Sequence, residues 1–66
     1  MTYEKGTIVK HERTGSIETI VGECRIKYNG EWVDGIIYEG PDRNTGVLTT
    51  FVRTKEEFEK EFKKIS

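Results

Sequence analysis

The stretch that decides the fold is CRIKYNGEWVDGIIY, residues 24–38, in which Asn29-Gly30 separates two runs of strand-forming residues. Both central residues of a two-residue type I′ turn need a positive φ, which Asn and Gly reach at little cost. The turn sets the register, so counting outward from it places Lys27 opposite Trp32 and Cys24 opposite Gly35. The stretch therefore predicts a complete β-hairpin.

The two faces of this hairpin differ in chemistry, because side chains alternate along each strand. One face is predicted to carry the apolar residues Cys24, Ile26, Val33 and Ile37. The other is predicted to carry the charged and aromatic residues Arg25, Lys27, Trp32 and Asp34. We expect the apolar face to join the core, with Cys24 buried and therefore unreactive.

The sequence around the hairpin predicts a meander of short strands. Residues 7–13 are rich in β-branched side chains and end at the turn residues 14–16. Residues 17–28 form a long strand in which Gly22 is expected to mark a bulge or sharp bend. A third strand over 32–39 stops at Gly40-Pro41-Asp42, where Pro41 favours a turn, and a fourth covers 47–53 after the loop 40–46.

A helix is predicted over about 55–65. Thr54 and Glu57 are the two ends of a capping box, in which each side chain accepts a hydrogen bond from the other residue's backbone amide. Phe58, Phe62 and Ile65 follow at i, i+4 and i+7 and form one apolar stripe. The residues expected to receive this stripe lie on the hairpin face opposite Ile26 and are Val21, Ile36 and Tyr38.

The chain of 66 residues has room for one domain with a modest core. We therefore expect a single domain over 1–66, with a β-meander over about 7–53 and a C-terminal helix over about 55–65. The predicted fold class is mainly β: a small antiparallel barrel or curled meander of four to five strands with a C-terminal α-helix.

Charge and composition exclude several classes of partner and location. The 11 Lys and Arg against 12 Asp and Glu give a net charge of −1, so no overall field draws the chain to DNA or to an anionic membrane. A single cysteine cannot form an internal disulfide, which favours a cytoplasmic location. No run of 18 apolar residues is present to span a membrane, and we expect no membrane partner.

No catalytic, metal or cofactor site is expected. His11 is the only histidine and Cys24 the only thiol, which is too few for a zinc site, and His11 is expected to be a surface strand residue. Residues 42–46 resemble the start of a calcium loop, but Arg53 stands at the twelfth position, where a Glu is required. The loop is expected to be a surface connection, with Arg43 at its tip as a possible partner contact.

Trp32 is the strongest candidate binding residue, because the register places its indole on the charged face of the hairpin. In one interpretation Trp32, Arg25, Lys27 and Tyr28 form a shallow patch for a peptide, a base or a nucleotide, since aromatic and basic side chains together suit stacking and anion contact. In the other, the indole packs against the Lys27 stem or beneath the first strand and serves only the fold. The sequence leaves both open.

Three short segments carry a resemblance to a known family: Gly6 to His11, Glu31-Trp32-Val33 followed by Tyr38, and Phe51-Val52-Arg53 before Phe58. They resemble a family of small uncharacterised bacterial and phage domains with a Gly-x-x-Tyr-x-His opening, a Glu-x-x-Val-x-Tyr middle and a Trp-Val-Arg-Pro ending. That family is SH3-like. The resemblance implies a compact SH3-like barrel of bacterial or phage origin, with Trp32, Tyr38 and Arg53 at its recurrent positions.

The function expected from these observations is that of a non-enzymatic binding module, monomeric or a small homo-oligomer, that contacts a protein partner. Such a module suits a phage or bacterial regulatory or inhibitor protein. The alternative is a nucleic-acid or nucleotide binder that uses the face around Trp32 to sequester a signal.

Overall fold

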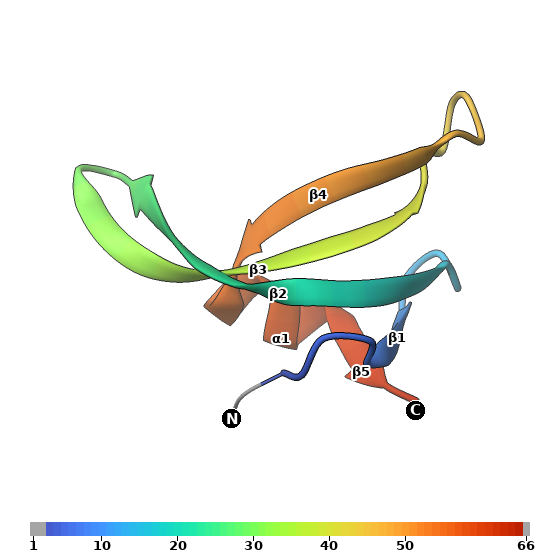
Figure 1. Ribbon diagram of the computed structural model, residues 1–66, viewed down its shortest axis with the longest axis horizontal. Helices are drawn as coiled ribbons and strands as arrows, with labels where there is room; N and C mark the ends of the chain where they lie inside the picture. The colour runs from blue at the N-terminus through green and yellow to red at the C-terminus, as the bar shows by residue number, and fades with distance from the viewer. Residues whose placement is uncertain (1–2, 66) are drawn as a thin grey trace.

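The computed structural model describes residues 3–65, which form one antiparallel sheet of five strands with a short helix on one face (Figure 1). The strands are β1 (Ile8–His11), β2 (Ile17–Tyr28), β3 (Glu31–Pro41), β4 (Leu48–Thr54) and β5 (Phe62–Lys64), and the helix is α1 (Lys55–Glu61). Their order across the sheet is β4-β3-β2-β1-β5. The mainly β, antiparallel architecture with a helix near the C-terminus is therefore confirmed. The sheet stays open, with β4 and β5 as its two edges, and does not close into a barrel.

The β2–β3 hairpin has the turn and the register predicted for it. Asn29 and Gly30 have φ values of 52° and 81°, as a type I′ turn requires. The strands pair without interruption from Tyr28 opposite Glu31 to Gly22 opposite Ile37. This hairpin is the longest feature of the molecule, and its tip projects beyond the rest of the sheet (Figure 1).

A β-bulge interrupts β2 next to Gly22, as predicted. The register shifts between Ile20 and Gly22, so that Tyr38 pairs with Ile20 instead of with Val21. Ile20 is consequently in the core at 1% exposure, whereas Val21 is only half-buried. The expectation that Val21 receives the helix is therefore wrong by one residue, because the extra residue of the bulge moves its neighbour onto the covered face.

The hydrophobic core lies on the helix-covered face of the sheet. It consists of Val9, Ile20, Ile36, Tyr38, Phe58 and Phe62, with Tyr3 and Phe51 packed against it. Ile36 and Tyr38 receive the helix as predicted. The opposite, open face has no covering layer, so Cys24 and its apolar neighbours on that face are half-buried. The expectation of a buried Cys24 is corrected accordingly.

Helix α1 starts as predicted and ends earlier than predicted. The Thr54 hydroxyl accepts from the Glu57 amide at 3.2 Å and caps the first turn. The helix stops at Glu61, and β5 follows at once, with Phe62 paired to His11 and Lys64 to Val9. Strand pairing therefore replaces the last helical turn, because β1 offers a free edge for hydrogen bonding. Ile65 is 54% exposed and does not join the apolar stripe predicted for it.

The other boundaries differ from the predicted ones by a few residues at most. β1 is confined to Ile8–His11, β3 continues through Pro41, and β4 begins at Leu48, which leaves residues 42–47 as the connecting loop. Within residues 3–65, no helix has the length and apolar character needed to cross a membrane.

Candidate functional site

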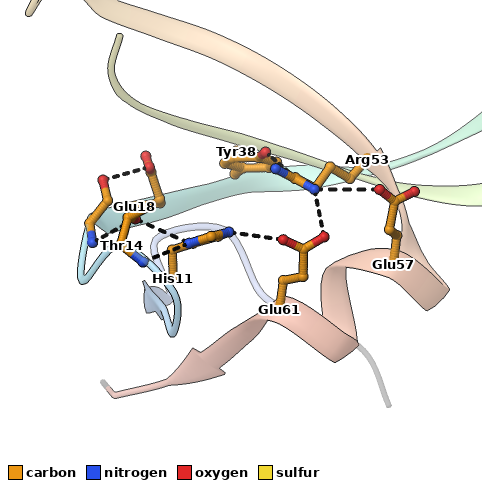
Figure 2. A network of polar contacts seen from close by, with 8 residues as sticks. His11, Thr14, Glu18, Tyr38, Arg53, Glu57 and Glu61 are labelled. Carbon is orange, nitrogen blue, oxygen red and sulfur yellow. Dashed lines mark hydrogen bonds and ion pairs between the residues drawn. The ribbon is translucent and has the colours of Figure 1, made fainter. Parts of the chain in front are cut away.

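A network of polar side chains joins the end of the helix to the sheet (Figure 2). Arg53, from β4, donates from Nε to the Tyr38 hydroxyl at 2.8 Å. Its Nη1 lies 2.9 Å from Glu61 Oε2 and 3.5 Å from Glu57 Oε1. The guanidinium thus bonds β3 and two turns of α1 together, which holds the helix in one position over the core.

His11 extends this network into β1. Its Nε2 lies 3.0 Å from Glu61 Oε1, and its Nδ1 accepts the backbone N–H of Thr14 at 3.2 Å. Because Nδ1 accepts, the ring proton is on Nε2, which donates to the carboxylate. At 8% exposure His11 is buried, which corrects the expectation of a surface residue. The His11 ring contacts Glu61 and Phe62, and Glu61 is 50 residues away in the chain, so no local pattern shows this burial.

The network fixes the charge state of its members. The hydrogen bond from His11, followed by the charge of Arg53, lowers the pKa of Glu61 below its usual range. Desolvation alone would lower the pKa of Arg53, but its bond to Tyr38 and the charges of Glu61 and Glu57 raise it. Burial raises the pKa of Tyr38 despite the nearby guanidinium. At neutral pH the cluster therefore holds a carboxylate, a guanidinium and a neutral phenol.

Three side chains contact one another in the order of a nucleophile, base and acid triad: Thr14, His11 and Glu61. Thr14 Oγ1 lies 3.1 Å from His11 Nδ1. A general base needs a free lone pair on the nitrogen that faces the nucleophile. Here that lone pair receives the Thr14 backbone N–H, and Thr14 Oγ1 itself accepts from the Ser16 amide at 3.3 Å. The contacts of Thr14 with His11 and Ser16 therefore stabilise the turn after β1.

An open depression of about 920 Å³ lies beside the network, between the turn after β1 and the loop after β3. Three arginines line it, Arg13, Arg43 and Arg53, together with the acidic residues Glu18, Asp42 and Glu61. The opposite charges are equal in number, so the depression has no net charge to attract an anion.

Glu18 is buried at the edge of this depression. Ser16 Oγ donates to its Oε1 at 2.9 Å, while Oε2 has no hydrogen-bond partner among the described residues. Oε2 lies against Gly40, and it occupies the position that the Cβ of any other residue at 40 would take. Gly40 is therefore required for close packing against the carboxylate, and the buried oxygen does not open into the depression.

The second polar surface is the tryptophan patch, which we define as Trp32, Lys27 and Arg25 near the hairpin tip. The Trp32 side chain is 61% exposed, and Lys27 Nζ lies 5.6 Å from the centre of its ring. Arg25 is anchored by an ion pair with Asp34 at 3.5 Å and a hydrogen bond to the Trp32 carbonyl. The lysine stacks on the indole, as the packing interpretation expects, yet most of the ring faces solvent.

The structure separates the other two candidate residues from this patch. Tyr28 pairs with Glu31, one position along from the Lys27–Trp32 pair, so it lies on the opposite face of the hairpin. Arg43 belongs to the loop between β3 and β4. That loop lies at the end of the sheet away from the hairpin tip (Figure 1). Three of the five candidate binding residues therefore form one surface.

Sequence reasoning missed the roles of His11 and Glu61 in the polar network. The resemblance singled out Tyr38 and Arg53 but gave no reason to place them in contact. Among residues 3–65 no group of three or more His, Cys, Asp or Glu side chains could hold a metal ion. Comparison with known proteins found no matching family model, curated protein or solved structure.

Proposed function

We propose that this protein is a non-enzymatic binding module that contacts a protein partner through the tryptophan patch. The observation that carries the proposal is the exposed Trp32 ring on a projecting hairpin. Tryptophan, tyrosine and arginine are the residue types most enriched among those that dominate the binding energy of protein interfaces. Lys27 Nζ lies over one face of the indole, and this contact restricts the ring before a partner binds, which reduces the entropy lost on binding.

The charges around the patch favour a protein over a nucleic acid. Arg25 is paired with Asp34, and Glu23 and Glu31 lie on the same hairpin. Binding of a phosphate backbone draws its affinity from unpaired basic residues, and here the acidic residues offset them. A protein surface with its own mixed charges is the better match.

The polar network supports the non-enzymatic part of the proposal. Arg53, Tyr38 and Glu61 hold α1 to the sheet, and His11 bonds to Glu61 through Nε2 and to the Thr14 backbone through Nδ1. These contacts give the network a structural role in holding the fold together, and that role supports a binding module over an enzyme.

We further propose that the fold is SH3-like, of bacterial or phage origin, and that the protein works in the cytoplasm. The strand order, with a short helix between β4 and β5 and β5 returning to pair with β1, supports an SH3-like arrangement. The bulge in the long β2 supports it as well, because such a bend lets one strand serve two halves of a small barrel. The single free cysteine supports the cytoplasmic location.

The experiment that tests the function uses a displayed library of random peptides selected on the immobilised protein. Peptides that bind the wild type should lose roughly 30-fold in affinity, about 2 kcal/mol, for Trp32→Ala. Tyr28→Ala is the matched control, since Tyr28 is a similarly exposed aromatic on the other face of the same hairpin. Both variants should unfold at the wild-type temperature.

Selected peptides that bind Trp32→Ala as tightly as the wild type would overturn the proposal. Single-stranded oligonucleotides are titrated in parallel, with Trp32 fluorescence as the signal. Oligonucleotide binding that weakens steeply as salt is raised would replace the protein partner by a nucleic acid.

A further inference from the structure

Strand β4 is an edge of the sheet that lacks the usual protection against pairing with another strand. Edge strands are normally short, or carry lysine or proline that discourages pairing. The opposite edge, β5, follows this rule, with three residues of which two are Lys63 and Lys64. β4 has seven residues, Leu-Thr-Thr-Phe-Val-Arg-Thr, rich in β-branched side chains and without lysine or proline.

The edge is also apolar where it meets solvent. Leu48 is 67% exposed and Val52 49% exposed, both on the open face of the sheet. The only charge in the strand is Arg53, which lies on the helix-covered face and is held there by Tyr38 and Glu61. The backbone and side chains of β4 are therefore free to accept an added strand with little desolvation of charge.

The sequence of β4 is complementary to itself in an antiparallel register centred on Phe51. In that register Val52 of one copy lies opposite Thr50 of the other, Leu48 lies opposite Thr54, and Arg53 lies opposite Thr49. Each pair shares a face of the sheet, β-branched residues meet across the strands, and no like charges oppose one another. A two-fold axis through Phe51 is sufficient to generate the contact, as in other isologous dimers.

The same register has a consequence for charge beyond the strand ends. Residue 47 of one copy would stand opposite residue 55 of the other, so we expect the loop 42–47 of each copy to lie near the start of α1 in the other. The first turn of α1 is acidic, with Glu56 and Glu57. Arg43, in the loop, forms no ion pair with the described residues of its own chain. The symmetry provides two such loop-to-helix contacts for each pair of molecules.

We propose that two copies of this chain associate through antiparallel pairing of their β4 strands, giving one continuous sheet across both molecules. The extended peptide of another protein could occupy the same edge. A second copy is favoured because it supplies both the complementary register and an acidic helix start for Arg43.

The test measures the mass of the protein in solution by sedimentation and by light scattering over a series of concentrations. The wild type should shift from 7.7 kDa toward twice that mass as its concentration rises. Thr50→Lys with Val52→Lys places lysine opposite lysine twice at the interface and should leave only the single-chain mass. Thr50→Glu with Val52→Lys places glutamate opposite lysine twice and should restore the doubled mass.

Two controls separate this result from misfolding and from the proposed function. Both double variants change exposed side chains and should keep the wild-type circular dichroism, and Ile65→Lys, at the other edge, should associate like the wild type. Trp32→Ala should also associate normally, so the two proposals fail independently. The β4 pairing is overturned if the wild type keeps the single-chain mass at every concentration. It is also overturned if the two double variants associate equally. If the wild type stays at the single-chain mass but binds extended peptides at β4, a second copy is ruled out and the edge is a binding site for a different protein.

Discussion

The rings of Phe58 and Phe62 stack with 4.3 Å between their centroids and 8° between their planes, although one belongs to helix α1 and the other to strand β5. Tyr38 lies within 5.3 Å of both ring centroids and completes an aromatic cluster. The spacing of four residues is helical, but the second ring reaches its place through a strand. The cluster is the centre of a small core, so removing one of its rings should lower the free energy of unfolding of the whole molecule.

Replacing Phe58 by Ala should lower the free energy of unfolding by about 3–5 kcal/mol, because the ring is fully buried and leaves a cavity. Urea unfolding followed by circular dichroism measures the change. Ile65→Ala is the control and should cost less than about 0.5 kcal/mol, since Ile65 lies outside the core. Equal losses in the two variants would mean that Ile65 packs in the core as Phe58 does.

Replacing Gly30 by Ala should lower stability by about 1–2 kcal/mol, because Gly30 has a φ of 81°, where an L side chain is strained. Gly22→Ala is the matched control in the same hairpin. Gly22 does not have a positive φ, and no heavy atom lies within 4 Å of the added Cβ. Thermal melting of the two variants should therefore differ, with only Gly30→Ala melting below the wild type.

The Glu61 carboxylate should make stability depend on acid pH. Its pKa is lower in the folded protein than in the unfolded chain, so its ionised form stabilises the fold above the ordinary Glu pKa. That contribution is lost as the pH falls through the folded pKa. We therefore expect wild type and Glu61→Gln to differ most in urea midpoint near neutral pH and to converge in acid.

Glu31→Gln is the control for that comparison, since Glu31 is exposed and has no ion pair among residues 3–65. Its urea midpoint should follow the wild type across the whole pH range. A constant difference between wild type and Glu61→Gln at every pH would show that the glutamine disturbs packing and that the charge itself contributes little.

The Cys24 thiol should react in the native protein, because it is half-buried on a sheet face without a covering layer. A thiol reagent should label it at a rate that low concentrations of urea do not change, since no opening of the fold is needed. Mass spectrometry after brief exposure measures the rate, with Cys24→Ser as the unreactive reference. Labelling that requires global unfolding would instead indicate a cover over the open face.

The parts of the fold that local sequence determines could be predicted. Asn29-Gly30 sets the turn and hence the pairing down to Gly22, and Thr54 with Glu57 marks the helix start. Gly22 indicated a bulge, but nothing local shows which residue is displaced, and so Val21 was expected in the place that Ile20 occupies. A bulge of one residue exchanges the faces of everything before it.

The parts that depend on distant partners could not be predicted. Phe62 continues a helical spacing, and only the free edge of β1 draws it into a strand. His11 is a polar residue whose burial depends on Glu61 at the far end of the chain. The hairpin register places Trp32 on the same face as Lys27 but leaves its exposure open, because Ile36 and Tyr38 share that face and are buried. The unprotected edge of β4 becomes visible only once the strand order is known.

The pairing of β1 with β5 has a consequence during synthesis on the ribosome. The β2–β3 hairpin depends on contacts close in sequence and can form as soon as it leaves the exit tunnel. β5 is translated after the other four strands, so until it emerges β1 has one unpaired edge and Phe62 is missing from the core. The nascent chain thus carries an exposed apolar surface until β5 has emerged, and this is the interval in which chaperones would act on it.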